Sequence, residues 1–454
     1  GTDLDVDGTA NLDVVDIDGA VDMASTLVVD GTINTLGITG SKANFTNSML
    51  ISNDAGTGTL STANNNTGFG HQVFNVLTTG DGNTGVGADV LSALTTGDNN
   101  VGVGLDVLKA LTTGSNNTAV GYLALSAEDT RSDSTAVGYR ALTAQNADTA
   151  NAYNVAIGTD AALSLTTGNR NVYVGALSGD ANVTGDGNTA LGHNTLSTNT
   201  HSENNVAVGY EALKTFNVTT GSGFNTAVGS VALTACTTGA DNTAIGGSAL
   251  AANTTGASNV AVGKSALTAN TTASFNTAVG KSTLAANTTG ANNVAIGEVA
   301  LQSNTTASDN TAVGVSALGS NTTAANNTAV GRAALGANTT GTRNTAVGAS
   351  AADAITTASD NTYVGHGAGS ANTSGDHNTG IGQASMDELT TGANNTALGS
   401  KSLSGVVTGD NNTAVGVSAL VANTTGAANV AVGQACLDAN TTGNNNVAVG
   451  KDAL

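Results

Sequence analysis

The chain of 454 residues is poor in the large side chains that fill a globular core, since aromatic residues make up 3% of it and proline and tryptophan are absent. At 39% hydrophobic it is nevertheless too apolar for a disordered segment, so its core must be thin and periodic. The formal net charge of -21, with only 12 lysine and arginine residues, argues against nucleic-acid binding, because phosphate contacts need clustered positive charge.

Residues 1–65 form a first segment, in which apolar and acidic residues alternate. Residues 4–8 and 15–19 each end in an Asp-Gly pair. Such alternation with Asp-Gly turns predicts short strands and hairpins. No loop here has the close carboxylate spacing of a calcium site, so we expect a solvated strand face and no bound cation.

From residue 66 to residue 454 the chain repeats one motif every 17 residues. We call each repeat a rung and number its positions 1 to 17. A rung reads Asn-Thr-Ala-Val-Gly, two variable residues and Ala-Leu, and it later turns through Asn-Thr-Thr-Gly. There are 23 rung starts, and only the intervals that begin at Ser134 and Asn205 stretch to 20 residues, with the extra triplets in the turn. A period of this kind predicts a stack of repeats.

Two positions of the rung scarcely vary. Position 5 is glycine in all 23 rungs, which indicates a positive φ or no room for a Cβ, and position 1 is asparagine in every rung except the one that starts at Ser134. Position 4 is always Val, Ile, Leu or Phe, and position 9 is usually Leu. As structural repeat residues we single out Asn117, Gly121, Asn242, Gly246, Leu250, Asn293, Gly297, Leu301, Asn412, Gly416 and Leu420.

Helix is a poor interpretation of a rung that carries glycine and β-branched residues at such short spacing. We expect two short strands in each rung, one at Thr-Ala-Val-Gly and one through Ala-Leu-x-Ala. Successive rungs then stack as parallel strands, which predicts an all-β parallel β-roll or β-solenoid. Stacked asparagines at position 1 would form a hydrogen-bonded ladder.

A single rung buries little, because one Val and one Leu gain roughly 4 kcal/mol against the ordering entropy of 17 residues. Sharing the apolar faces of several chains would offset this deficit. We therefore expect a homotrimeric rod.

Candidate sites are few. Tyr122, Tyr139 and Tyr210 hold position 6, directly after the repeat glycine, where long polar residues in other rungs indicate an outward surface. These tyrosines could contact sugars or proteins, although scattered surface tyrosines need no such role. Three histidines share this position, but no His-x-His pair favours a metal site, so we expect none.

No catalytic or cofactor-binding arrangement stands out, and we expect a protein that is not an enzyme. Segments such as Gly-Val-Gly at 85–87 lack the helix and the Lys-Ser/Thr pair of a phosphate loop. Cys236 and Cys436 are about twelve rungs apart, roughly 55 Å at strand spacing, so they cannot pair within one chain. No apolar run reaches the ~18 residues of a transmembrane helix.

The repeat resembles the head repeats of trimeric autotransporter adhesins (YadA-like heads), whose layers carry a Ser-Val-Ala-Ile-Gly type motif. Residues 154–158 and 293–297, which read Asn-Val-Ala-Ile-Gly, are the nearest matches. The resemblance covers residues 66–454 and implies a left-handed parallel β-roll in a three-chain bundle, although those heads use a shorter repeat. Similar repeats occur in phage tail fibres, and the Asp-Gly segments of residues 1–65 resemble tail-fibre shafts.

These resemblances imply a non-enzymatic structural fibre. We expect an extracellular phage tail fibre, part of the virion, whose shaft supports host attachment through a receptor or glycan bound outside this chain. A bacterial cell-surface adhesin head is the alternative. An ice-binding solenoid is a remote third possibility, because adjacent threonines in Asn-Thr-Thr-Gly point opposite ways and form no flat Thr-x-Thr face.

Overall fold

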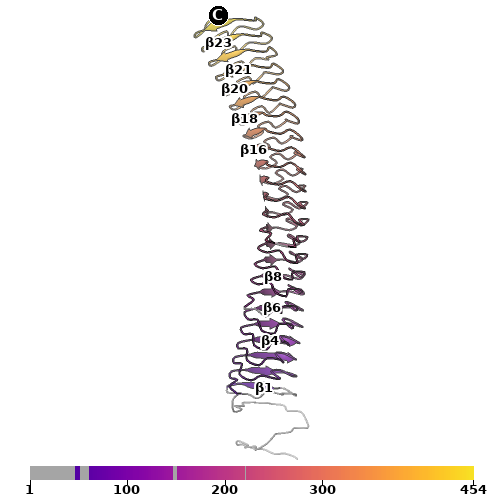
Figure 1. Cartoon of the computed structure of the whole chain (residues 1–454). Coiled ribbons are helices and arrows are strands. Elements are labelled where there is room, and N and C mark those ends of the chain that lie inside the picture. Colours follow the sequence, from indigo (N-terminus) through magenta and orange to yellow (C-terminus); the bar gives the residue numbers. More distant parts are fainter. Residues whose placement is uncertain (1–46, 52–60, 147–150, 220) are drawn as a thin grey trace, which may run out of the picture. The chain divides into compact units, whose positions relative to one another are not determined.

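A computed structural model describes residues 47–51, 61–146, 151–219 and 221–454. The chain divides into two units, residues 1–40 and 41–454, and all described residues belong to the second. The hairpins predicted before residue 47 lie outside the described residues. Every regular element in the described part is a β-strand (Figure 1).

The strands are β1 (Met49–Ile51), β2 (Thr67–Phe69), β3 (Thr84–Ala88), β4 (Val101–Leu105), β5 (Thr118–Val120), β6 (Thr135–Val137), β7 (Val155–Ile157), β8 (Val172–Val174), β9 (Thr189–Leu191), β10 (Val206–Val208), β11 (Thr226–Val228), β12 (Thr243–Ile245), β13 (Val260–Val262), β14 (Thr277–Val279), β15 (Val294–Ile296), β16 (Thr311–Val313), β17 (Thr328–Val330), β18 (Thr345–Val347), β19 (Thr362–Val364), β20 (Thr379–Ile381), β21 (Thr396–Leu398), β22 (Thr413–Val415), β23 (Val430–Val432) and β24 (Val447–Val449).

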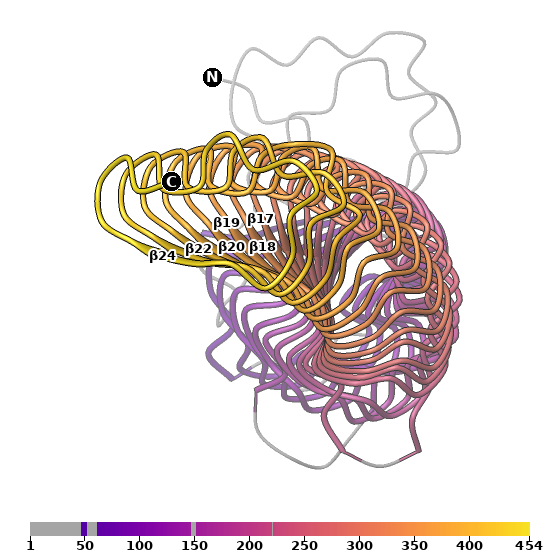
Figure 2. The same ribbon diagram turned by 90° about the horizontal axis from the view of Figure 1, so that it is seen from above.

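The strands form one parallel sheet in which each strand pairs with the next along the chain. In β12 and β13, Thr243 lies beside Val260 and Ala244 beside Ala261, so each position stacks on its own copy. Figure 2, which looks along the stack, shows the rungs as similar closed loops laid over one another. The structure confirms the predicted all-β solenoid of 17-residue repeats.

The stack begins one rung before the repeat motif can be recognised. β1 pairs in parallel with β2, and the backbone N–H of Asn66 donates to Ser48 Oγ at 2.8 Å. Ser48 therefore fills position 1, so the boundary predicted between residues 65 and 66 lies inside the stack. The signal was missed because this rung has serine in place of asparagine and because 18 residues separate the paired positions.

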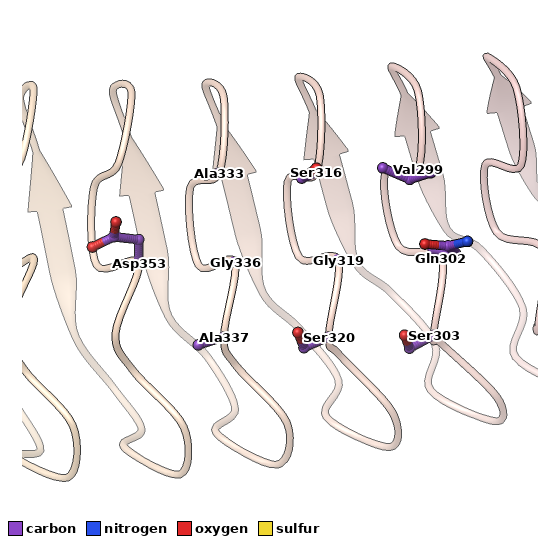
Figure 3. Close-up of a pocket in the computed structure, with 10 residues that line it drawn as sticks. All are labelled: Val299, Gln302, Ser303, Ser316, Gly319, Ser320, Ala333, Gly336, Ala337 and Asp353. Atoms are coloured by element: carbon purple, nitrogen blue, oxygen red, sulfur yellow. The ribbon is translucent and has the colours of Figure 1, made fainter.

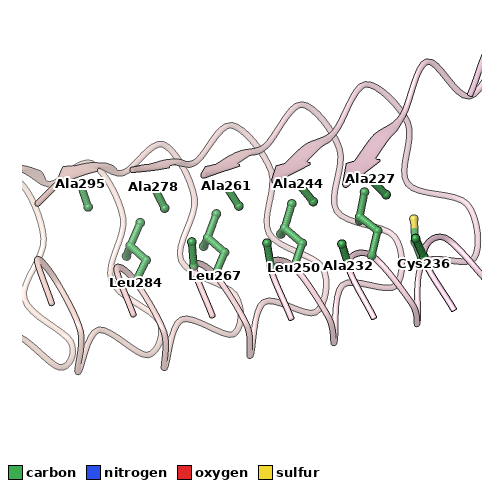
Figure 4. Packing of buried hydrophobic residues seen from close by; sticks show 14 of the residues in the cluster. Ala227, Ala232, Cys236, Ala244, Leu250, Ala261, Leu267, Ala278, Leu284 and Ala295 are labelled. Carbon is green, nitrogen blue, oxygen red and sulfur yellow. The ribbon is translucent and has the colours of Figure 1, made fainter. Parts of the chain in front are cut away.

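The core lies between the strand and the turn segment opposite it (Figure 4). Position 3 of the strand points inward, as in Ala244, and it is fully buried against positions 8 and 9, as in Ala249 and Leu250. Positions 2 and 4 of the same strand alternate to the outside, because successive side chains of a strand point to opposite faces. The Val at position 4, which the sequence reasoning counted as core, therefore lies on the outer face.

The second predicted strand, through Ala-Leu-x-Ala, is wrong. This segment is a run of turns, with positive φ at position 7 (60° at Ser248) and at position 9 (51° at Leu250). It still bonds to the next rung, since the N–H of Leu250 donates to the carbonyl of Ala266 at 3.0 Å. Burial of the leucine in a stacked rung outweighs the cost of a left-handed backbone at a non-glycine residue.

The glycine at position 5 meets both demands that its invariance predicted. Gly246 has a φ of 132°, and a Cβ built on it would lie 2.6 Å from the carbonyl carbon and oxygen of Gly263 in the next rung. The strand turns sharply here, with the backbones of adjacent rungs in close approach.

The structure contains the predicted ladder of asparagines at position 1. In Asn259, the backbone N–H donates to Asn242 Oδ1 at 3.0 Å, and Nδ2 donates to the same oxygen at 3.1 Å. The Nδ2 group also donates to the carbonyl of Ala273 at 2.9 Å, which ties the strand to the end of its own rung. These side chains are buried, so the ladder satisfies polar groups that would otherwise be costly.

A second asparagine ladder at position 12 was not predicted. It runs without interruption from Asn253 to Asn338, and each Nδ2 donates to the Oδ1 of the rung before, at 2.8 Å for Asn270 on Asn253. Asn270 Nδ2 also donates to the Ala273 carbonyl, which thereby joins the two ladders. The sequence Asn-Thr-Thr-Gly is typical of a turn, so the pattern alone did not indicate that its asparagine forms a hydrogen-bonded ladder.

Large and small residues exchange places in two rungs. Tyr173 replaces the alanine of position 3, and Gly179 replaces the leucine of position 9, where a Cβ would lie 2.2 Å from the tyrosine ring. Asn182 Nδ2 donates to the buried Tyr173 hydroxyl at 2.6 Å. Tyr363 and Gly369 repeat the exchange. Burial raises the pKa of both tyrosines.

The two 20-residue rungs keep the register of the stack. Thr135 still pairs with Val155, and Val206 with Thr226, so the extra residues leave the strands undisturbed, as predicted.

A buried arginine, Arg131, lies in the interior of the stack next to the first 20-residue rung. The guanidinium group of Arg131, in the rung before, donates to the carbonyls of Thr166 and Thr167, at 3.2 and 3.4 Å, and to Asn169 Oδ1, in the rung beyond. In the second 20-residue rung a buried phenylalanine, Phe216, packs against Gly223.

Gln145 carries the position 1 ladder past Ser134. Its Nε2 donates to Ser134 Oγ at 3.0 Å, and its Oε1 accepts from Asn154 Nδ2 at 2.8 Å. Gln145 Nε2 also donates to buried Glu128, at 2.7 Å. Burial raises the pKa of Glu128, an effect that this hydrogen bond and one from the Arg131 backbone oppose.

Candidate interaction surface

The outer face of the sheet is formed by positions 2 and 4 of every rung, and we call it the outer sheet face. Position 2 is Thr or Val, position 4 is Val, Ile, Leu or Phe, and neither position carries a charged residue in any of the 23 rungs. Many of the position 4 side chains are exposed, among them Ile245 at 40%, Leu398 at 48% and Phe69 at 56%. Apolar side chains therefore follow one another along the whole stack without a break.

The size of this row sets it apart from an ordinary surface. At roughly 50 Å² for an aliphatic residue about a third exposed, the 23 residues at position 4 expose on the order of 1,000 Å². Contiguous apolar patches on monomeric proteins rarely exceed a few hundred Å². A standard protein interface buries about 800 Å² per partner, so the outer sheet face is large enough to be one.

The residues predicted as structural repeat positions build the stack and are not available to a partner. The asparagines Asn117, Asn242, Asn293 and Asn412 and the leucines Leu250, Leu301 and Leu420 are buried, and Gly121, Gly246, Gly297 and Gly416 have φ between 126° and 133°.

The predicted surface tyrosines are exposed, but other side chains lie against their rings. The rings of Tyr122 and Tyr139 stack on each other with centroids 5.4 Å apart, and the Arg140 guanidinium lies 5.0 Å from the Tyr139 centroid. Tyr210 stacks on His193 at 5.8 Å. Another side chain therefore lies against each of these rings, and a role in sugar contact remains a prediction.

Four of the seven ion pairs of the described residues join adjacent rungs, and the other three lie within one rung. Arg140 donates to both carboxylate oxygens of Asp160, at 2.8 and 2.9 Å, and Arg343 does the same with Asp360. The hydrogen bond from Arg343 lowers the pKa of Asp360. Among the described residues no group of three or more His, Cys, Asp or Glu side chains could hold a metal ion.

The Asn-Thr-Thr corners separate their two threonines, as the sequence predicted. Thr254 Oγ1 donates to the carbonyl of Thr271 at 3.0 Å, whereas Thr255 is exposed. The triplet also matches the Asn-x-Ser/Thr pattern of N-glycosylation, but Asn253 is fully buried, so the folded chain does not present its side chain to solvent.

Both cysteines are free and buried, in agreement with their separation in the repeat. Cys236 takes position 12, where most of the following rungs have asparagine, and its thiol lies 3.3 Å from the Gly239 carbonyl. Burial raises the pKa of Cys236 to about 11.

Comparison with known proteins assigns the chain to no family. No protein-family model matches the chain, and no curated protein matches it. In the described part of the chain, no helix has the length and apolar character needed to cross a membrane.

Proposed function

We propose that this chain is the rod of a non-enzymatic structural fibre, assembled from three copies that meet through their outer sheet faces. The observation that carries the proposal is the row of uncharged side chains at positions 2 and 4, all of them partly or fully exposed. A partner that covers this row from end to end needs apolar groups at the same strand spacing. A second copy of the same chain meets that requirement at every rung.

The fibre we favour is the shaft of a phage tail fibre, an extracellular part of the virion that supports attachment to the host. A repetitive, unbranched solenoid suits a spacer, because each rung contacts only its neighbours and length grows with rung number. The head of a bacterial surface adhesin is the second candidate, since the repeat resembles adhesin heads.

Oligomeric state tests the assembly. Light scattering of the purified chain should give three times the 43.8 kDa protomer mass. Replacement of Ile296 and Val330 by lysine places two charges on the outer sheet face and should shift the protein to monomer. Replacement of both Val315 and Val417 by lysine is the matched control, because these exposed residues hold position 6, which already carries Lys264 and Lys281 in other rungs.

A wild-type chain that is monomeric at micromolar concentration would overturn the assembly. The biological setting needs a different measurement. Antibodies against the purified rod should label virion tails in electron micrographs of phage lysates, whereas labelling confined to bacterial surfaces would establish the adhesin instead.

A further inference from the structure

A notch of about 530 Å³ opens on the side of the core away from the strands (Figure 3). Two consecutive rungs have glycine at position 10, Gly319 and Gly336, and Gln302 and Asp353 of the flanking rungs close the notch along the stack. At strand spacing the two closing residues are roughly 14 Å apart.

The two glycines are not required by their φ, although a Cβ would lie 3.2 Å from the Ser316 carbonyl oxygen at Gly319 and 3.0 Å from the Ala333 carbonyl oxygen at Gly336. Position 10 holds Lys, Leu, Asp, Thr, Ser and other residues elsewhere, and it is glycine only in these two of the 22 rungs that include it. Neither glycine has a left-handed φ. The missing side chains create space on the surface of these two rungs, and the many other residues at position 10 show that a rung accommodates a side chain there.

The side chains that line the notch restrict which class of ligand could bind there. The walls carry the hydroxyls of Ser303, Ser316 and Ser320, the amide of Gln302 and the carboxylate of Asp353, together with small apolar groups. Desolvation by burial raises the pKa of Asp353. No lysine or arginine lines the notch, which disfavours an anionic ligand, and the hydroxyls disfavour a lipid.

An extended peptide is disfavoured because the backbone here is already bonded. The N–H of Gly336 donates to the Ala333 carbonyl at 3.0 Å, and the N–H of Ser320 donates to the Gly336 carbonyl in the next rung at 3.2 Å. No free row of backbone groups is left for strand addition. The remaining hydrogen-bonding capacity lies in side chains that both donate and accept.

We propose that the notch binds a short neutral oligosaccharide. Adjacent sugar hydroxyls donate to the Asp353 carboxylate, the Gln302 amide both donates and accepts, and the serine hydroxyls bond along the ligand. Sites of 300–1,000 Å³ with a few placed polar groups are typical of small-molecule binding. The site lies across the core from the outer sheet face, so it stays open whether or not copies associate there.

The test uses the full chain on an array of immobilised neutral di- to tetrasaccharides built from glucose, galactose, mannose and N-acetylglucosamine. Wild-type protein should bind at least one of them, and free sugar should compete. Gly319→Gln and Gly336→Gln, which fill the notch, should each weaken that binding by about tenfold or more. Asp353→Asn should weaken it as well.

Ala285→Gln is the matched control, because it adds the same side chain at position 10 outside the notch, and it should bind like wild type. Two results would overturn the inference: no binding to any sugar of the array, or binding that survives both glycine substitutions. Neither result depends on the oligomeric state, so failure here is distinguishable from failure of the fibre proposal.

Discussion

Each rung position that keeps the same residue along this solenoid does so for one local structural reason. At position 5 the demand is geometric, because the next rung leaves no room for a Cβ and φ is positive. At positions 1 and 12 it is a hydrogen-bonding demand, met by asparagines that donate to the rung before and to the end of their own rung.

Substitution of one repeat glycine tests the geometric demand. Gly246→Ala should destabilise its rung by at least about 2 kcal/mol, because the new Cβ meets the Gly263 backbone in a strained conformation. Hydrogen exchange of the amides around β12 should report the loss. Gly247→Ala is the control, since no atom lies within 4 Å of its Cβ, and equal effects of the two changes would refute the explanation.

The exchange of Tyr173 and Gly179 predicts strong coupling. Gly179→Leu alone forces a side chain into the tyrosine ring, and Tyr173→Ala alone leaves a cavity costing about 3–5 kcal/mol. The double variant restores the Ala and Leu of the common rung, so it should be much more stable than the sum of the single changes. Denaturation of the four proteins measures this coupling, and additive effects would contradict it.

At the scale of elements, the sequence predicts a strand at positions 2–5, its parallel stacking and the ladder at position 1, and in most rungs the strand covers positions 2–4. It could not predict the turns at positions 7–9, because a leucine with positive φ goes against its intrinsic preference and is stabilised only by burial in the stack. The inward direction of position 3, and hence the outer sheet face, also follows from where those turns place the core. The sequence alone therefore missed the candidate surface while it identified the residues that compose it.

Cys236 holds position 12 in the rung directly before the start of the position 12 ladder at Asn253, and its ionisation gives a pH test. Its pKa in the fold is about 11, above an ordinary value of 9.0, so the thiol stabilises the fold fully below pH 9 and loses that contribution between pH 9 and 11. Cys236→Asn removes this titration and places an amide beside Asn253. The stability of the variant relative to wild type should rise across that range, by up to about 3 kcal/mol.

Denaturation of both proteins at pH 8, 9, 10 and 11 measures the difference. Cys436→Ala serves as a control for loss of a buried thiol at position 8. A difference between Cys236→Asn and wild type that stays constant with pH would exclude the buried thiol as its source.

At the scale of the stack, every rung contacts its neighbours through the same register, so whole rungs should be interchangeable. Deletion of residues 293–309 removes one rung and joins position 17 to position 1 as before. Far-UV circular dichroism should keep its shape, and the melting temperature should change by only a few degrees. Deletion of residues 293–308, one residue fewer, shifts the register and should disrupt folding nearby; equal tolerance of both would contradict the account.

Arg131, in the rung before the first 20-residue rung, and Phe216, inside the second, suggest how a solenoid of this kind can change during evolution. Arg131 lies in the core next to the first 20-residue rung and Phe216 lies in the core of the second, and the strands of both rungs keep their pairing. We therefore expect that a rung can gain a short insertion without loss of strand pairing when one core residue changes in size at the same time. Insertions on the surface can then vary while the hydrogen bonds between stacked strands stay the same.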